Sequence, residues 1–280
     1  MKAFAQTTTT SHRVLPGFRL SLSYTLVYLT VLLAIPLAAC LAKVSSLTPS
    51  QFLAAAWTDR ARAAYLLTFG TSFASALINV PLGLLLAWIL VRYEFPCKRL
   101  LDSLIDLPFA LPTAVAGLVY ANLYVQNGWF GRYLVPLGIH GAYSRFAIVL
   151  VLTFIGLPFI VRTVQPVLET IDVEIEEAAS SLGATRLQTF WRILLPSLAP
   201  ALTTGFALTF ARSLGEYGSV VFVSGNIMFK TEIAPVLIVN QLEEYHYAEA
   251  TAIALVLLAG SFATLAVINS LERWNRRHEG

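Results

Sequence analysis

The chain has 280 residues, of which 57% are hydrophobic and only 12% are charged, and its formal net charge at pH 7 is +3. Charged residues make up about 25% of ordinary soluble domains, so a water-soluble protein of this length could not bury so much apolar surface. We therefore expect the lipid bilayer to be the solvent for most of the chain. A net charge this small does not indicate a nucleic-acid-binding surface, and we expect no nucleic acid among the partners.

Six membrane-spanning helices are predicted in chain order. About 20 apolar residues cross the hydrocarbon core at 1.5 Å per residue, and long stretches without Lys, Arg, Asp or Glu meet this requirement. The predicted spans cover approximately residues 20–42, 65–91, 107–128, 144–163, 197–223 and 249–271. The predicted fold class is all-α, with one transmembrane domain at residues 17–275 between a polar tail at residues 1–16 and a short tail at residues 276–280.

The basic residues predict the orientation of these spans. With six spans, both termini lie on one side of the membrane, and that side carries twelve lysines and arginines against six on the other. Cytoplasmic loops carry an excess of Lys and Arg. Both termini are therefore predicted to be cytoplasmic, and so is the long loop at residues 164–196.

Two prolines lie close together in the predicted third span. Pro108 and Pro112 each remove an internal backbone hydrogen bond, so they predict a kink or break near the cytoplasmic end of this span. Prolines are also frequent in ordinary membrane helices. The residues alone leave it open whether this break serves a function.

The loop at residues 164–196 has the pattern of two short amphipathic helices joined by a glycine. Apolar residues at positions 175, 178, 179 and 182 form one helical stripe, and those at positions 187, 190, 191 and 194 form another. Gly183 lies where a left-handed helix cap is expected, and Thr185 and Gln188 have the spacing of a capping box for the second helix. Pro196 is expected to end this second helix and begin the next span.

The two apolar stripes of this loop are expected to be buried against another surface. They could pack on the protein's own helices or on lipid headgroups, or they could enter a groove of a partner protein. Periodicity alone does not decide which of these surfaces the stripes contact.

Arg212 and Glu216 are two charged residues within the predicted fifth span. Their spacing of four places them on one helix face, near the middle of the span. A lone charge there costs at least about 2.5–3.5 kcal/mol, so we expect the two to pair and to face protein or water. Two interpretations stay open: a structural pair between helices, or an arginine on the pathway of an anion with Glu216 weakening its binding.

The loop at residues 164–196 resembles the EAA loop of ABC importer permeases. Seven residues match it at fixed spacing: Glu177, Ala178, Ala179, Gly183, Ile193, Leu195 and Pro196. In that family the loop carries a coupling helix that sits in a cleft on an ATP-hydrolysing subunit. The resemblance implies that these residues contact a separate ATPase, which binds ATP and Mg²⁺, and that this chain is a transport subunit without catalytic residues or a cofactor of its own.

Three further segments are similar to the T-type permease of sulfate and thiosulfate ABC importers. They are DLPFALPTAVAGL at residues 106–118, PFIVRTVQPVLE at residues 158–169 and RSLGEYG at residues 212–218. This similarity implies the type I ABC importer permease fold and sulfate or thiosulfate as the cargo. The implied location is a bacterial inner membrane, with a plastid membrane as the alternative.

The resemblance also implies the partners. They are two copies of an ATP-binding subunit, a W-type permease and an extracytoplasmic sulfate- or thiosulfate-binding protein. The alternatives are a permease for molybdate or tungstate, and a secondary anion transporter, in which the EAA loop would have no role. The four histidines, at positions 12, 140, 246 and 278, are too scattered for a metal site, and the chain has no GxxxxGK[ST] phosphate-binding loop.

Overall fold

The computed structural model describes residues 17–278, and its side chains up to residue 270. The predicted tail at residues 1–16 lies outside the described residues, as do the last two residues of the predicted tail at residues 276–280. Within the described range every regular element is a helix. The chain divides into two compact units, Met1–Thr48 and Pro49–Gly280.

The first unit contains one apolar helical segment, Phe18–Val44, which is long enough to cross a membrane. It consists of α1 (Phe18–Leu29), a π-helical turn η1 (Thr30–Ala34) and α2 (Ile35–Val44). The π-helical turn directly precedes Pro36, which lies in the first turn of α2. Proline lacks the N–H that would bond one turn back, and the wider turn accommodates this loss without ending the helix.

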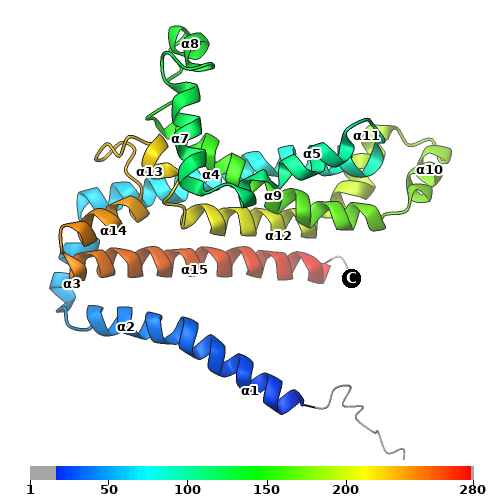
Figure 1. Ribbon diagram of the computed structural model, residues 1–280. Helices are drawn as coiled ribbons and strands as arrows, with labels where there is room; N and C mark the ends of the chain where they lie inside the picture. The colour runs from blue at the N-terminus through cyan, green and yellow to red at the C-terminus, as the bar shows by residue number, and fades with distance from the viewer. Residues whose placement is uncertain (1–16, 279–280) are drawn as a thin grey trace, which may run out of the picture. The chain divides into compact units, whose positions relative to one another are not determined.

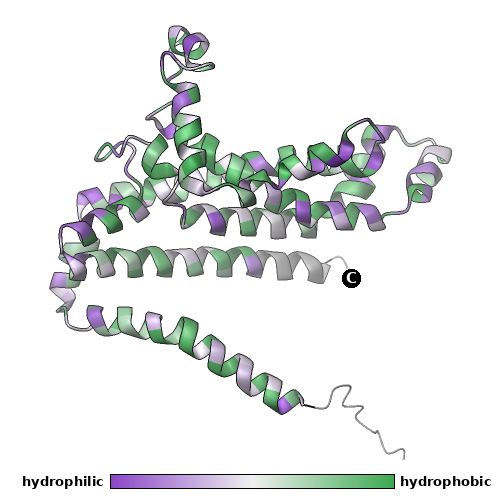
Figure 2. Cartoon of the chain, in the orientation of Figure 1, coloured by the Kyte–Doolittle hydropathy of each residue, from purple (hydrophilic) through white to green (hydrophobic). Residues whose placement is uncertain are grey.

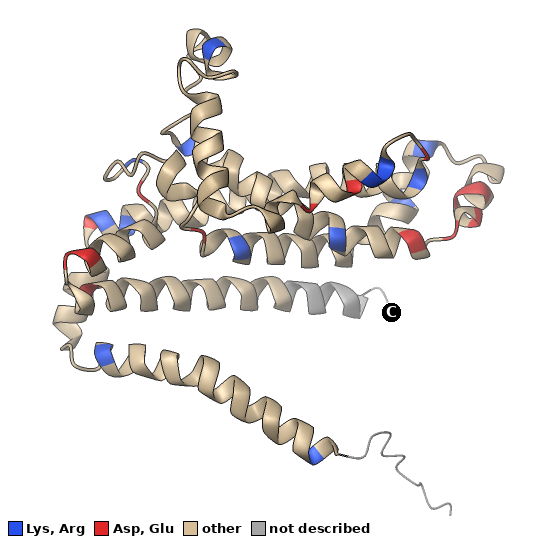
Figure 3. Ribbon diagram, viewed as in Figure 1, with Lys and Arg blue, Asp and Glu red and all other residues tan. Residues whose placement is uncertain are grey.

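Three long helices form the core of the second unit: α4 (Asp59–Arg92), α9 (Arg145–Thr170) and α12 (Leu195–Leu214) (Figure 1). Thr58 caps α4 by accepting a hydrogen bond from the Ala61 N–H at 3.1 Å, and Ser144 caps α9 in the same way from the Ala147 N–H. The helices are apolar along most of their length (Figure 2), and charged residues are sparse along them (Figure 3). Their buried faces meet in an apolar cluster that includes Leu90, Ile160, Val164, Leu168 and Leu198.

A second set of buried residues on α4 is polar. Thr68, Ser72, Ser75 and Asn79 follow one face of the helix, and the Thr68 hydroxyl donates a hydrogen bond to its own helix, at the Ala64 carbonyl. Such back-bonding satisfies a hydroxyl in an apolar core. The Ser75 Oγ lies 3.4 Å from the Ser213 Oγ. Because Ser75 lies halfway along the 34-residue α4, the carboxyl end of α12 lies level with the middle of α4.

The shorter elements of this unit connect or cover these three helices (Figure 1). They are α3 (Pro49–Ala56), α5 (Lys98–Ile105), α6 (Leu107–Ala110), α7 (Thr113–Tyr124), α8 (Gly131–Leu134), η2 (Val135–Leu137), α10 (Val173–Ser181), α11 (Arg186–Thr189), the π-helical turn η3 (Phe190–Leu194), α13 (Val220–Val223) and α14 (Ala234–Glu243). The last helix, α15 (Tyr247–His278), contacts α3, α12 and α14.

Five helices in the described part of the chain are long and apolar enough to cross a membrane: Phe18–Val44, Asp59–Arg92, Arg145–Thr170, Arg186–Leu214 and Tyr247–Ser270. The stretch predicted as the third span, residues 107–128, is divided between α6 and α7. The backbone is extended at Leu111, and Pro112 precedes the first residue of α7. Pro108 lies in the first turn of α6, where a missing N–H has little cost. The count of six spans and the cytoplasmic termini stay predictions.

The stretch predicted as the fifth span differs from the sequence-based expectation at both ends. Pro196 does not end the preceding helix, because the π-helical turn η3 directly before it accommodates the missing hydrogen bond, as η1 does before Pro36. One continuous helical segment therefore runs over Arg186–Leu214. At its other end, the helix stops at Leu214 and the chain resumes a helix only at Val220. The single helix predicted at residues 197–223 was wrong in both respects.

Candidate functional site

The first candidate site is a hairpin over residues 173–194, in which α10 is joined at Gly183 to α11 and the following turn η3; we call it the α10–α11 hairpin. Glu174 and Glu176 lie in the first turn of α10, where the positive end of the helix dipole stabilises them. Gly183 has φ +83°, and its N–H donates to the Ser180 carbonyl at 2.9 Å. The left-handed glycine cap predicted from the sequence is confirmed.

The second helix of the hairpin begins with a complete capping box. Thr185 Oγ1 accepts a hydrogen bond from the Gln188 N–H at 3.3 Å, and Gln188 Oε1 accepts one from the Thr185 N–H at 2.8 Å. This pair satisfies two N–H groups that have no partner inside the helix. The capping box predicted from the sequence is therefore confirmed, and it directs α11 away from the turn at Gly183.

Much of the apolar surface of the α10–α11 hairpin is uncovered. Leu182 is 89% exposed, Leu187 66% and Trp191 59%, whereas Ala179 and Leu194 are buried. Beside Leu182 lies a groove of about 270 Å³, lined by Leu182, Gly183, Ala184, Gln188, Thr189, Arg192 and Ile193. Burial of apolar area stabilises a contact by roughly 25 cal/mol per Å², so this surface is suited to bind an apolar partner.

The seven residues that resemble the EAA loop occupy different parts of this structure. On α10, Glu177 and Ala178 are exposed and Ala179 is buried. Gly183 forms the turn, and Ile193 lies half-buried in η3. Leu195 and Pro196 begin α12, so they connect the hairpin directly to a core helix.

The carboxyl end of α4 holds the hairpin in place. Arg92 is the last residue of α4, and its Nη2 atom lies 2.8 Å from Oε1 of Glu176 on α10. The same nitrogen donates a hydrogen bond to the Ile171 carbonyl at the end of α9. One turn earlier, Trp88 packs edge-to-face on Phe190 of η3. Sequence reasoning treated Arg92 only as a charge that sets orientation, because nothing in the local pattern identifies a partner 84 positions away.

The second candidate site is the Arg212–Glu216 pair. Arg212 Nη1 donates to Glu216 Oε2 at 2.6 Å, so the two residues do pair. The Glu216 side chain is 3% exposed and the Arg212 side chain 36%. They do not lie on one helix face, because α12 ends at Leu214 and Glu216 lies in the turn that follows. That part of the prediction was wrong.

Glu216 also organises the turn that follows α12. Its Oε1 accepts hydrogen bonds from the Ser219 N–H and from the Ser219 Oγ, both at 2.9 Å. A buried carboxylate with three charge-assisted hydrogen bonds is a stable arrangement where a lone one is not. Glu216 therefore both pairs Arg212 and fixes the backbone at residues 215–219.

The broken third stretch and the turn after α12 lie against one another. A Cβ placed on Gly117 of α7 would lie 2.8 Å from the Ser219 Cα, and one placed on Gly218 would collide with Thr113 Oγ1. Only glycine permits backbones this close. The two segments similar to the T-type permease, residues 106–118 and 212–218, are thus brought into direct contact.

A further polar cluster joins α9 to the segment before α6. Arg162 makes a two-point contact with Asp106, at 3.0 Å from Nε and 2.6 Å from Nη2, and its Nη1 donates to Asp102 Oδ1 at 2.6 Å. Asp106 makes no capping hydrogen bond with α6. Sequence reasoning missed this cluster, although Asp106 and Arg162 both belong to the segments that carry the resemblance.

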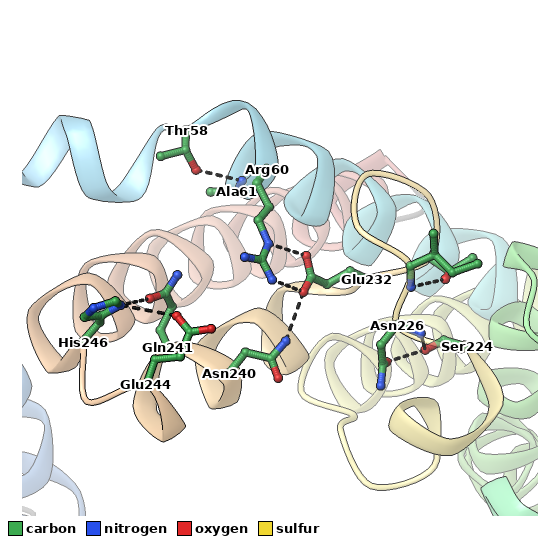
Figure 4. Close-up of polar contacts among 12 residues, drawn as sticks. Thr58, Arg60, Ala61, Ser224, Asn226, Glu232, Asn240, Gln241, Glu244 and His246 are labelled. Atoms are coloured by element: carbon green, nitrogen blue, oxygen red, sulfur yellow. Dashed lines mark hydrogen bonds and ion pairs between the residues drawn. The ribbon is translucent and has the colours of Figure 1, made fainter.

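At the other end of α4, Arg60 forms a bidentate pair with Glu232 (Figure 4). The distances are 2.8 Å from Nε and 2.7 Å from Nη2, and the Asn240 amide also donates to Glu232 at 3.1 Å. Nearby, Ser224 and Asn226 are hydrogen-bonded to each other at 2.7 Å. These contacts order the loop at residues 224–233 beside α4.

Comparisons with known proteins show a family, close sequence relatives and a shared fold. A family model for binding-protein-dependent transport system inner membrane components matches residues 79–277. The sulfate transport system permease protein CysT of Synechocystis sp. is 52% identical over 254 residues, which cover 91% of this chain and 89% of that protein. The protein of the same name from Escherichia coli is 47% identical over 271 residues, which cover 96% and 98% of the two chains. A bacterial alginate ABC transporter, solved in complex with an alginate pentasaccharide-bound periplasmic protein, matches with a TM-score of 0.76 at 18% identity over 91% of this chain and 93% of that chain.

Proposed function

This chain belongs to the family of binding-protein-dependent transport system inner membrane components, and from that premise we propose that it is a permease subunit of an ATP-driven importer of sulfate or thiosulfate. The observation that carries the proposal is similarity to sulfate transport permeases, at 47–52% identity over more than 90% of the chain. The all-α fold of type I ABC importer permeases, which the resemblance implied, is confirmed.

The α10–α11 hairpin is the surface on which a separate ATPase acts. Its apolar residues Leu182, Leu187 and Trp191 are exposed. Leu182 lies in the turn, and the other two lie at the start of the Arg186–Leu214 segment, before α12. A contiguous exposed apolar surface marks an interaction site. Two ATP-binding subunits, each binding ATP and Mg²⁺, would occupy this hairpin and that of a second permease of the W type. The seven residues of the EAA loop then connect the ATPase to α12 through Leu195 and Pro196.

Arg212 lies beside the anion pathway. Its side chain is 36% exposed, and only its Nη1 atom has a described contact with Glu216. An arginine this exposed, level with the middle of a membrane-length helix, is too costly to face lipid. A pathway between this chain and the second permease removes that cost and presents a cation to a dianionic cargo. Glu216 keeps the site from binding the anion too strongly to release it.

The transport cycle follows from these parts. ATP binding closes the two ATPase subunits, the hairpins move with them, and the pathway opens toward an extracytoplasmic binding protein that delivers sulfate. The membrane is the bacterial inner membrane, with a plastid membrane as the alternative. The family description, which refers to inner membrane components, and the bacterial relatives from Synechocystis and Escherichia coli support this location. Molybdate and tungstate are the alternative cargoes, since both are tetrahedral dianions.

Growth and uptake by a deletion strain test this proposal. Cells that lack the chain, and have no second sulfate carrier, are expected to grow on cysteine but not on sulfate, and a plasmid copy is expected to restore uptake of labelled sulfate. Excess thiosulfate should compete with that uptake, whereas excess molybdate should not. Unchanged sulfate uptake in the deletion strain would falsify the cargo assignment, and strong competition by molybdate would favour the alternative oxyanions.

A further inference from the structure

Helix α4 is the longest helix in the described part of the chain, and both of its ends are fixed by an arginine. At 1.5 Å per residue its 34 residues extend roughly 50 Å, more than the thickness of the hydrocarbon core. Arg60 is its second residue and Arg92 its last. Each forms an ion pair with a carboxylate in another part of the chain, Arg92 with Glu176 on α10 and Arg60 with Glu232 in the loop before α14.

At the Arg92 end, α4 contacts three successive parts of the chain. Arg92 reaches Ile171 at the end of α9 and Glu176 on α10, and its side chain is 15% exposed. The guanidinium also lies over the Trp88 ring, 5.8 Å from its centre, and Trp88 in turn packs on Phe190. Helix α10 and the turn η3, on the two arms of the α10–α11 hairpin, are therefore tied to the last turn of α4.

At the Arg60 end, α4 holds the loop at residues 224–233 and the start of α14. The bidentate pair with Glu232 fixes direction as well as distance, and the Glu232 side chain is 3% exposed. Two turns further along α4, Thr68 Oγ1 accepts a hydrogen bond from the Ala234 N–H at 2.8 Å. The loop and the first turn of α14 are thus attached to α4 at two separate points, of which Figure 4 shows the pair between Arg60 and Glu232.

Between its ends, α4 is packed too closely to slide along its neighbour. A Cβ placed on Gly83 would lie 2.6 Å from the Ile160 Cβ of α9, and Ala87 and Leu90 are buried in the same apolar cluster. Helices α4 and α9 are therefore expected to move together here, so that a displacement imposed at one end of α4 is passed on and not lost by sliding between them.

We propose that α4 links the α10–α11 hairpin mechanically to the loop at residues 224–233, with Arg92 and Arg60 as the positioning residues at its two ends. This rests on the proposed function, in which the hairpin meets the ATPase and the loop lies on the side where the binding protein arrives. Docking of the loaded binding protein changes both the affinity for ATP and the rate of its hydrolysis through α4. ATP binding in turn changes the affinity for the binding protein by the same factor as docking changes the affinity for ATP.

The test uses the full complex with both permeases, the ATPase and the binding protein, reconstituted in vesicles. The measured quantity is the ratio of ATPase rates with and without sulfate-loaded binding protein. Arg92→Gln and Arg60→Gln are each expected to lower this stimulation ratio about fivefold or more, as expected for loss of an allosteric coupling. The basal ATPase rate and the amount of assembled complex should stay at the wild-type level.

A matched control is Lys98→Gln. The Lys98–Glu94 pair at 2.7 Å is also an ion pair near the same end of α4, but it joins residues four apart and its Glu94 side chain is 88% exposed. This variant should keep the full stimulation ratio. An equal loss in Lys98→Gln would overturn the assignment, because any change of charge near the membrane would then have the same effect.

Two combined variants separate a shared route from two local defects. Arg60→Gln with Arg92→Gln should lose no more stimulation than either alone, whereas independent defects multiply. The reversal Arg92→Glu with Glu176→Arg should regain part of the stimulation that Arg92→Glu loses. If Arg92→Gln does not assemble, this reversal tests the role of the Arg92–Glu176 pair in its place, and a reversal that regains no stimulation would contradict that role. Full stimulation in both single glutamine variants, or a multiplied loss in the double variant, would contradict the proposal. If wild type itself shows no stimulation, the proposed function fails instead.

Discussion

Gly117→Ala tests the contact between α7 and the turn after α12. The new Cβ would lie 2.8 Å from the Ser219 Cα and carbonyl carbon, and even closer to the carbonyl oxygen. These are backbone atoms and cannot rotate away, so α7 or the turn must shift. Overpacking typically costs about 1–3 kcal/mol, and the gain from replacing a helical glycine is at most about 1 kcal/mol. We expect a net loss of about 1–2 kcal/mol, since a backbone clash belongs at the upper end of that range.

The shift also reaches the charged pair. Ser219 supplies two of the three hydrogen bonds of Glu216, which in turn pairs with Arg212. Gly117→Ala should therefore lower the rate of sulfate transport as well as the midpoint of thermal unfolding of the purified complex. A decrease in both quantities is the expected result.

Gly70→Ala is the matched control for this measurement. Gly70 lies inside α4, and a Cβ placed there meets no atom within 4 Å. This substitution should raise the unfolding midpoint slightly, because alanine is the better helix former by about 0.5–1 kcal/mol. If Gly117→Ala unfolds at or above the wild-type midpoint while Gly70→Ala behaves as expected, the close contact described here is wrong.

Three further predictions concern the hairpin, the charged pair and the orientation. Gly183→Val should leave the chain inserted but reduce co-purification of the ATPase, because a non-glycine residue at φ +83° costs about 1–2 kcal/mol. Gly183→Asn should reduce co-purification less, and equal co-purification in the wild type and both variants would contradict this. Arg212→Gln should assemble, since Ser219 still holds Glu216, but should transport at least about tenfold more slowly, the effect of about 1.4 kcal/mol; a normal rate would exclude a role in the pathway. Reversal of the pair, Arg212→Glu with Glu216→Arg, should not assemble, because the Ser219 N–H would then face a cation, and normal assembly would contradict this. In a background without the two native cysteines, a cysteine at Ile227, which is 45% exposed, should react with an impermeant thiol reagent from outside, whereas cysteines in the two tails should not; labelling of a tail would overturn the orientation.

The α10–α11 hairpin could be predicted from the sequence because its determinants are local. A left-handed glycine and a capping box act within a few residues, and Gly183, Thr185 and Gln188 have these roles in the structure. The apolar stretches of the long helices could also be predicted from the sequence, since they depend only on runs of apolar residues.

The contacts that assemble the site depend on distant partners and could not be predicted in this way. Arg92 pairs with Glu176 and Arg60 with Glu232 only because α4 packs beside other elements. The end of α12 at Leu214 was also missed. Spacing suggested that Arg212 and Glu216 share a helix, whereas the hydrogen bonds from Ser219 stabilise Glu216 in a turn.

Two prolines illustrate a further limit. A proline normally ends a helix or bends it, so Pro196 was expected to separate the hairpin from the next span. In the structure a π-helical turn precedes both Pro196 and Pro36, and the helix continues through each. The sequence pattern does not distinguish a helix that ends at proline from one that widens before it.

The central claim is that this chain transports sulfate at the expense of ATP hydrolysed by a partner bound at the α10–α11 hairpin. Its most direct test is the uptake of labelled sulfate into vesicles that contain the purified complex, with the loaded binding protein inside the compartment that corresponds to the cell exterior and ATP supplied on the other side. We predict sulfate movement that requires ATP, the binding protein and an intact hairpin, and that is lost in Gly183→Val. Sulfate movement that proceeds without ATP, or that survives removal of the ATPase subunits, would contradict the account.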